Sequence, residues 1–241
     1  MDISREQMEF RNSKPSKLGR GIERLTHPFG KAIAGMVPKS IVESAMKGID
    51  EATSYPKLVE FSHDPADMDA SQKAAKRVVR AARAVSASTG AAAGFGGALS
   101  MGLDIPATIA IALRTIRDTG RAYGFDGEGA DEKMFRLKIL ELSALDGDHD
   151  RDLRIAELVD SIADDGTLRS PDHKEITPVI DQVVERVSRA VALASFRKRL
   201  GMVVPIAGAA IGGIVNSSFQ NDVGKAARFA FQARRLKQDI P

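Results

Sequence analysis

The sequence predicts an all-α protein, a bundle of about seven to nine helices. Apolar residues recur at three- and four-residue spacing along most of the chain, and no alternating strand pattern of useful length occurs. The composition favours an aliphatic helical core, since tryptophan is absent and only two tyrosines occur. Two long uncharged stretches, Ala84–Leu103 and Leu200–Asn221, are rich in glycine and alanine. We expect these two segments to pack near the centre of the bundle.

Small residues in both stretches indicate close helix contacts. The stretches are about as long as the ~20 residues of a membrane span, but small and hydroxyl residues dilute their apolar character. Residues four positions apart share a helical face, so paired glycines let a partner helix approach. A buried Asn216 would bond to Asp104 or a backbone carbonyl, or would line a site for a lipid-like ligand. The predicted seams contain Gly90 and Gly94 in the first stretch, and Pro205, Gly208, Gly212 and Asn216 in the second.

The N-terminal part is expected to stand apart from the main bundle. Residues 1–17 are polar and of mixed charge, so we expect them to be loosely ordered, while residues 19–50 are amphipathic. Prolines mark residues 55–70 as a connector. The chain is therefore divided into an N-terminal helical segment with a flexible start, residues 1–66, and one compact helical domain, residues 67–241.

Helix signals place the elements of the larger domain. A first helix is expected to start near Asp67 and to run to about Ser88. Asp104 is a good N-cap and Pro106 is tolerated in a first turn, so the next helix is expected from Ile105 to about Tyr123, ending at Gly124. Its predicted outer face carries Arg114, Arg117, Asp118 and Arg121. Further helices are expected through Phe135 to Leu142, after an acidic loop within 145–165, over 178–198, and over 221–237 as a basic tail.

The helix after Asp67 carries the sharpest basic feature of the chain. Five cations, Lys73, Lys76, Arg77, Arg80 and Arg83, share one of its faces. Two interpretations remain open: a solvated helix face, or a surface that contacts anionic lipid headgroups. Nucleic acid is not expected as a partner, because no aromatic side chains interleave with these cations to stack bases.

Charge is distributed unevenly along the sequence. Residues 126–186 contain 17 acidic and 8 basic side chains, although the whole chain has a net charge of +3. The basic ends could steer the protein to an anionic surface, with Arg228, Arg234 and Arg235 of the tail as further lipid contacts. The chain has no cysteine, and its first residues lack the apolar region of a secretory signal. We therefore expect a cytoplasmic protein, located in part at the inner face of the cell membrane.

No catalytic signature occurs in the sequence. Asp146, Asp148 and Asp150 have the spacing of a calcium loop, with Glu157 at its twelfth position. Arg151, however, stands where the sharp turn of such a loop needs glycine, so an acidic, solvated start of a helix is the favoured interpretation. The four histidines lie far apart, and neither a nucleophile elbow nor a phosphate-binding loop is present. We expect no metal and no cofactor; a role without catalysis is favoured, and enzymatic activity stays open.

Two stretches of the sequence carry the pattern of a known family. They contain Gly102 to Pro106 with Tyr123 and Gly124, then Pro205 to Gly213 with Asn216, and Val223 to Arg228. In these residues the chain resembles the EcsC family of bacterial proteins, and the two stretches with the segment between them cover about the C-terminal two thirds. The resemblance implies a helical protein that acts at or near the cytoplasmic membrane, in a family named for its association with an ABC-transporter operon, and it implies no defined catalytic activity.

Three functions of different classes remain as hypotheses. The leading one is a peripheral membrane protein with an accessory or regulatory role in membrane transport or envelope processes. Its partners would be an anionic membrane surface and a transporter or other membrane protein. The alternatives are a soluble binder of a lipid-like molecule between the glycine-lined helices, and a hydrolase whose dispersed residues leave no motif.

Overall fold

The described part of the chain is helical. The computed structural model of the 241-residue chain describes residues 3–13, 55–94, 101–144, 148–169 and 208–238. These ranges contain no β-strand, only an isolated antiparallel bridge between Ile162 and Leu168. The all-α prediction is confirmed, while the number of helices in the whole chain stays a prediction. The helices are α1 (Ile3–Asn12), α4 (Met68–Gly94), α5 (Met101–Ala122), α6 (Ala130–Ala144), α7 (Asp148–Asp160) and α9 (Gly208–Gln238).

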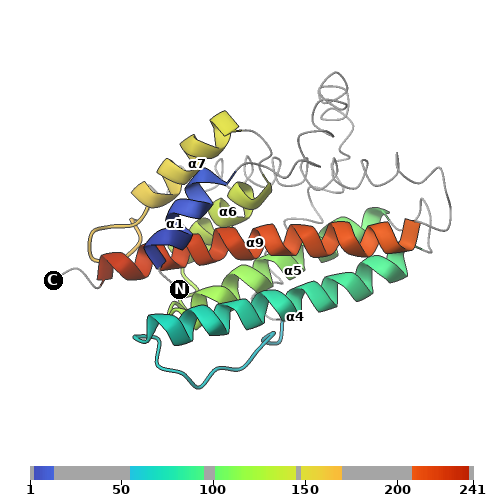
Figure 1. Ribbon diagram of the computed structural model, residues 1–241, viewed down its shortest axis with the longest axis horizontal. Helices are drawn as coiled ribbons and strands as arrows, with labels where there is room; N and C mark the ends of the chain where they lie inside the picture. The colour runs from blue at the N-terminus through green and yellow to red at the C-terminus, as the bar shows by residue number, and fades with distance from the viewer. Residues whose placement is uncertain (1–2, 14–54, 95–100, 145–147, 170–207, 239–241) are drawn as a thin grey trace.

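Helix α9 organises the bundle. It contacts each of the other described helices, and it runs side by side with α4 and α5 along the long axis of the molecule (Figure 1). The shorter helices α1, α6 and α7 gather around its C-terminal half (Figure 1). Apolar residues from all six described helices and from the turns beside them form a single core.

Small side chains let α4 and α9 approach closely. The inner face of α4 buries Ala74, Ala75 and Ala82 completely. Gly224 of α9 faces Val79 of α4 so closely that an added Cβ would lie 2.3 Å from a Val79 methyl group. Close helix contact at a glycine is therefore present in the described residues, at a glycine outside the predicted seams.

The N-terminus differs from the expectation of loose order. Residues Ile3–Asn12 form helix α1, which packs on α9. Phe10 is buried, and its ring stacks on Phe229 with 4.5 Å between the centroids. The mixed charges that suggested disorder find partners in the fold, since Glu6 pairs with Arg228 of α9. The two sequence ends thus share one core.

The start and end of α5 test two predicted signals. The helix begins at Met101, so Asp104 lies inside its first turn and does not cap it, which corrects the prediction. Pro106 lies in the second turn, where its missing N–H leaves one helical bond unmade. The predicted end at Gly124 is confirmed, because this residue has a φ of +86° and Gly124 N–H donates to the carbonyl of Arg121.

The described parts of both Gly/Ala segments lie in helices that differ from the predicted ones. Helix α4 starts after Asp67, whose carboxylate accepts from Ala70 N–H at 2.9 Å, and it continues past Ser88 to Gly94. Residues 208–221 of the second segment and the basic tail form one continuous helix, α9, where two were predicted. Glycine costs a helix about 1 kcal/mol relative to alanine, and packing of α9 against each of the other described helices offsets that cost. The predicted helices over 19–50 and 178–198 lie outside the described residues.

The connectors agree with their sequence signals. Helices α6 and α7 occupy the predicted segments, and the link 55–67 precedes α4 without helical structure. After α7 the chain turns at Gly166, which has a φ of +77°. Asp165 holds this turn by accepting from the N–H and hydroxyl of Thr167 at 2.9 and 2.6 Å.

Candidate functional site

The five predicted cations of α4 form one face of that helix, here called the basic face of α4. Lys73, Arg77, Arg80 and Arg83 are exposed and Lys76 is half-buried. The opposite side of α4 is buried against α5 and α9, so the side chains of this face point away from the core. The predicted exposure of the cations on α4 is therefore present in the fold.

Three of the five cations on the basic face have no ion pair within the described residues. No carboxylate of the described part lies within ion-pair distance of Lys73, Arg77 or Arg80. The Nε of Arg80 reaches the carbonyl of Lys76 at 3.4 Å, a bond along the helix itself. One acidic residue, Asp69, is exposed on the same side one turn earlier. The face thus presents cations to solvent over about ten residues, or ~15 Å of helix.

The basic residues of the tail have a different environment. Arg228 contacts Glu6 at 3.0 Å, with both side chains mostly buried. Arg234 is buried, and its guanidinium contacts Glu132 at 2.7 Å and lies over the ring of Phe125, 4.1 Å from the centroid. These two arginines join α9 to α1 and α6, so they are not surface groups as the lipid-contact prediction required. Arg235 is partly exposed and donates to Gln238 on its own helix.

The predicted glycine seams lie on helices, but their packing stays a prediction. Gly90 and Gly94 belong to the last turns of α4, while Gly208, Gly212 and Asn216 belong to the first turns of α9. Asp104 and Pro106 belong to α5, whose first turns precede its described side chains. Pro205 lies outside the described residues.

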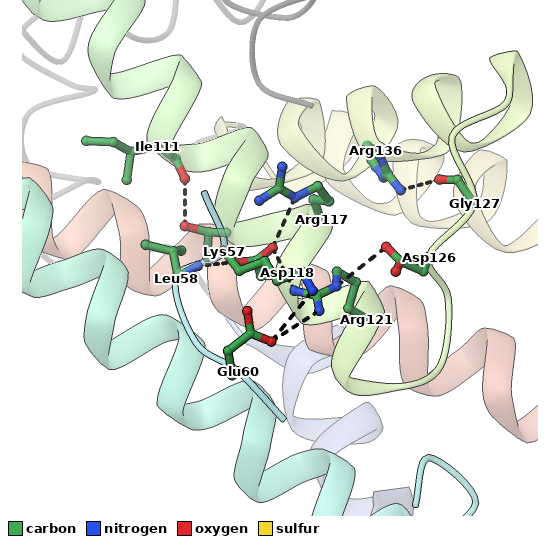
Figure 2. A network of polar contacts seen from close by, with 11 residues as sticks. Lys57, Leu58, Glu60, Ile111, Arg117, Asp118, Arg121, Asp126, Gly127 and Arg136 are labelled. Atoms are coloured by element: carbon green, nitrogen blue, oxygen red, sulfur yellow. Dashed lines mark hydrogen bonds and ion pairs between the residues drawn. The ribbon is translucent and has the colours of Figure 1, made fainter. Parts of the chain in front are cut away.

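Sequence reasoning missed a second group of charges, on the polar side of α5. Arg114, Arg117, Asp118 and Arg121 were predicted to face solvent, and we call them the charged face of α5. Instead Asp118 is completely buried and Arg117 is 7% exposed. The connector covers this face, because Leu58 N–H donates to the Asp118 carboxylate at 2.5 Å (Figure 2). A carboxylate between arginines at helical spacing was the available sequence signal.

Asp118 is the centre of this network. Its Oδ1 lies 3.0 Å from Arg117 Nε and 3.7 Å from Arg121 Nη1 (Figure 2). Arg121 also reaches the exposed carboxylates of Glu60, at 3.9 Å, and Asp126, at 3.5 Å. A buried carboxylate needs such partners, because an isolated buried charge is strongly disfavoured. Asp118 thereby ties the connector to α5 and to the turn that follows it.

Arginines crowd one another on this side of the molecule. Burial lowers the pKa of Arg114, Asp118 opposes that shift, and the charge of Arg117 adds to it. Burial also lowers the pKa of Arg136 on α6, where Glu132 opposes the shift and Arg117 adds to it. Arg136 bonds to the carbonyl of Gly127 (Figure 2). The positive charge of Arg117 therefore repels those of Arg114 on the same helix and Arg136 on α6.

A separate polar cluster joins α1 to the long helices. Glu6 accepts from Arg228 at 3.0 Å and from Gln232 at 3.1 Å, and Gln72 of α4 also donates to it. Burial raises the pKa of Glu6, but the Arg228 charge and these hydrogen bonds lower it more, so the net pKa lies below the ordinary value. Gln232 also donates to the Tyr123 hydroxyl at 3.1 Å, and burial raises the pKa of that phenol. The cluster fixes α1 on α4 and α9.

The predicted calcium-like segment is helical where it is described. Residues 148–160 form α7, and Arg154 lies 2.5 Å from Glu157, the twelfth position of the would-be loop. Helical residues cannot wrap around an ion as a calcium loop does, while Asp146 lies outside the described residues. No group of three or more metal-ligating side chains occurs in the described part. His63 binds the Ala122 carbonyl at 2.8 Å, a contact within the fold.

Two further features bear on membrane and ligand binding. Among the described residues, no helix is long and apolar enough to cross a membrane. A pocket between α6 and the turn after α7 is lined by Phe135, Lys138 and Leu168 among others, and has a volume of about 30 Å³. That volume holds about one water molecule, so this pocket is too small for a lipid-like ligand.

Comparison with known proteins identifies the family. The model of the EcsC protein family matches residues 3–236. The chain is 23% identical over 236 residues to Protein EcsC of Bacillus subtilis (strain 168), a match that covers 93% of this chain and 90% of that protein. It is 27% identical over 158 residues to the uncharacterized protein YdbA of the same strain, covering 63% of this chain and 53% of YdbA. No solved structure matches the chain. Because the family model spans nearly all of the sequence, this chain belongs to the EcsC protein family.

Proposed function

We propose that this protein is a peripheral membrane protein that docks on anionic lipid through the basic face of α4. One observation carries the proposal: Lys73, Arg77 and Arg80 point away from the core and are exposed, without an ion pair to any described carboxylate. Anionic headgroups attract such a row of cations, and a peripheral protein needs no spanning helix.

The arrangement of cations on the basic face suits a flat anionic surface such as a membrane. Its cations lie along about three helical turns, so several can approach one surface together. Each contributes about 1 kcal/mol near an anionic membrane. The buried arginines Arg228 and Arg234 are left out of this proposal, since their ion pairs with Glu6 and Glu132 hold the helices together.

A protein docked on the membrane could have an accessory or regulatory role in membrane transport or envelope processes. The partner in such a role would be a membrane protein, such as a transporter. The location would then be the inner face of the cell membrane. The alternative of a lipid-like ligand gains no support from the pocket beside α6, because that pocket has room for about one water molecule.

Liposome flotation tests the docking proposal. The full chain is mixed with vesicles of neutral lipid, or of neutral lipid with phosphatidylglycerol, at low and high salt. We expect binding to the anionic vesicles only, and loss of binding at high salt as the Debye length shortens. Replacing Lys73, Arg77 and Arg80 by glutamine removes about 3 kcal/mol of attraction, which weakens binding about 100-fold.

A matched variant separates position from net charge. Replacing Lys57, Lys133 and Lys225 by glutamine removes the same charge from exposed residues outside the basic face. This control should retain most of the binding. Equal losses in the two triple variants, or binding that persists at high salt, would contradict docking through α4.

A further inference from the structure

Helix α1 contacts the rest of the bundle through one narrow side. Its inward residues share a single helical face, and the remaining residues of the helix are exposed. Phe10 is the one buried residue of α1, while Met8 is 60% exposed. A helix shorter than about 12–15 residues is marginally stable by itself in water, so α1 depends on a few contacts for its order. The inward residues are Ile3, Glu6, Gln7 and Phe10.

The surface that receives α1 binds a carboxylate. Glu6 accepts from Arg228 Nε at 3.0 Å and from Gln232 Nε2 at 3.1 Å, both on α9. The side-chain amide of Gln72, on α4, donates to the same carboxylate. The side chains of Glu6 and Arg228 are 14% and 13% exposed, so their contact is largely shielded from solvent. Charge-assisted hydrogen bonds are roughly twice as strong as neutral ones, which makes an acidic residue at this position of the helix a requirement for tight docking.

One turn later, the same surface binds an aromatic ring and the end of the helix. The Phe10 ring stacks on Phe229, and the Arg151 guanidinium of α7 lies 4.4 Å from the Phe10 centroid. Arg151 Nη2 also donates to the Phe10 carbonyl at 3.0 Å, at the end of α1 where carbonyls have no helical partner. Gln7 Nε2 donates to the carbonyl of Phe229 at 2.9 Å. These contacts fix the register and the direction of α1.

These contacts have the pattern of helical peptide recognition. Proteins that bind an amphipathic helix commonly contact it at positions i, i+3, i+4 and i+7, and α1 is contacted at positions 3, 6, 7 and 10. Because α1 is short and buries a single residue, we expect it to open at a lower free energy than the long helices. Its departure would uncover a cationic and aromatic site, here called the α1-binding surface, formed by Gln72, Arg151, Arg228, Phe229 and Gln232.

We propose that the α1-binding surface is a docking site for a helix of a partner protein, and that α1 occupies this site as an internal competitor. The partner helix carries an acidic residue and, four positions later, an aromatic residue, at the spacing of Glu6 and Phe10. Its acidic residue complements Arg228. The inference does not rest on membrane docking, because the residue that α4 contributes, Gln72, is buried on the inner side of that helix.

A peptide added to the full chain tests the competition. The probe is a fluorescent peptide of residues 1–13, amidated at its C-terminus, and its binding is followed by fluorescence anisotropy. In the unaltered chain the internal α1 has a high effective concentration and should keep the peptide out. Phe10→Ala in the chain weakens the internal α1 and leaves the α1-binding surface unchanged. We expect this chain to bind the peptide at least about tenfold more tightly than the unaltered chain.

A second opened variant keeps the test independent of one substitution. Glu6→Gln in the chain should also admit the peptide, because it removes the charge that Arg228 binds. Far-UV circular dichroism must match that of the unaltered chain in each variant used. Saturable binding to neither opened variant overturns the proposal. Equal binding to the opened and the unaltered chains overturns it as well, since α1 would then not compete.

Matched substitutions on α9 locate the binding. Adding Arg228→Gln to the Phe10→Ala chain should weaken peptide binding by about tenfold or more, because the peptide carboxylate loses its charged donor. The control adds Lys225→Gln, which removes the same charge from an exposed position of α9. This control should bind the peptide like the Phe10→Ala chain. Equal losses in the two double variants would contradict docking at the α1-binding surface.

Altered peptides test which residues of the partner are recognised. Glu6→Gln or Phe10→Ala in the peptide should weaken its binding to the opened chain by about tenfold or more. A peptide with alanine at positions 4, 5, 8, 9, 11 and 12 keeps the inward face and should bind about as tightly as the native sequence. The proposed partner chemistry is wrong if the first two peptides bind as well as the native one.

Hydrogen exchange and oligomeric state complete the test on the unaltered chain. Amides of residues 7–12 should exchange at least about tenfold faster than those of residues 224–232 in α9, because α1 opens without the rest of the fold. Exchange that is equally slow in both segments would show that α1 does not leave its site, and would overturn the proposal. Dimers that excess peptide dissociates would assign the site to α1 of a second copy and overturn a different partner.

Discussion

The basic face of α4 and the charged face of α5 are alike in sequence and opposite in environment. Each consists of charged residues at helical spacing on a helix whose other side is apolar. On α4 the cations are exposed, whereas on α5 Arg117 and Asp118 are buried under the connector. The two faces differ in the carboxylate of Asp118, which accepts a hydrogen bond from Leu58 N–H and thereby holds the connector against α5. Charge periodicity alone thus does not tell a surface from an interior network.

The strongest test of this difference is Asp118→Asn. Removing the buried carboxylate leaves Arg117 and Arg121 without their shared partner, and we expect the free energy of unfolding to fall by about 3–5 kcal/mol. Urea denaturation followed by circular dichroism measures the change. The control Asp69→Asn, at an exposed position of α4, should change stability by less than about 0.5 kcal/mol. If both substitutions change the free energy of unfolding by a similarly small amount, the buried network of α5 does not differ in stability from the exposed face of α4.

Packing behind the basic face of α4 provides the second test. Gly224→Ala would place a Cβ 2.3 Å from a Val79 methyl group, so either the Val79 side chain or the two helices must shift. We expect a loss of about 1–3 kcal/mol in the free energy of unfolding, as for an overpacked core. Adding Val79→Ala should restore part of the loss by making room. If the double variant is less stable than Gly224→Ala alone, the clash between the new Cβ and Val79 is not the cause of the loss.

A smaller effect is expected at Glu6, which has a lowered pKa in the fold. Glu6→Gln removes the ion pair with Arg228, and we expect a loss of about 1–2 kcal/mol at pH 7. Because the pKa of Glu6 is lower in the folded protein than its ordinary value of 4.5, the ionised carboxylate stabilises the fold at pH values above 4.5. This stabilisation is lost as the pH falls through the folded pKa. Urea denaturation between pH 3 and pH 7 should show the difference between the two proteins narrowing below about pH 4.5. A difference that is constant with pH would contradict the role of the Glu6 charge.

The smallest stability effect is expected on the basic face of α4 itself. Lys73→Gln with Arg77→Gln and Arg80→Gln should change the free energy of unfolding by less than about 0.5 kcal/mol, because exposed charges contribute little to stability. Thermal melting at low salt measures it. A gain in stability would indicate that the cations repel one another, and a large loss would show that they belong to the fold.

Local signals determined a good part of this fold. Asp67 marked the start of α4, and Gly124 marked the end of α5. Each of these signals acts through backbone groups within a few residues of itself, so sequence alone carries it. The family likewise followed from residue patterns, and the match over residues 3–236 confirms it.

Only the tertiary structure decided which charged residues face solvent. Arg234 and Asp118 have the charge of surface residues, but their partners, Glu132 and Leu58, are distant in sequence. The polar N-terminal residues were predicted to be loosely ordered, but Phe10 stacks on Phe229 and Glu6 pairs with Arg228 in the fold. Long-range pairing offsets the desolvation of a charge, and no local pattern reports it. The sequence therefore determines the helices and many of their ends, while packing decides which of their faces remain available for binding.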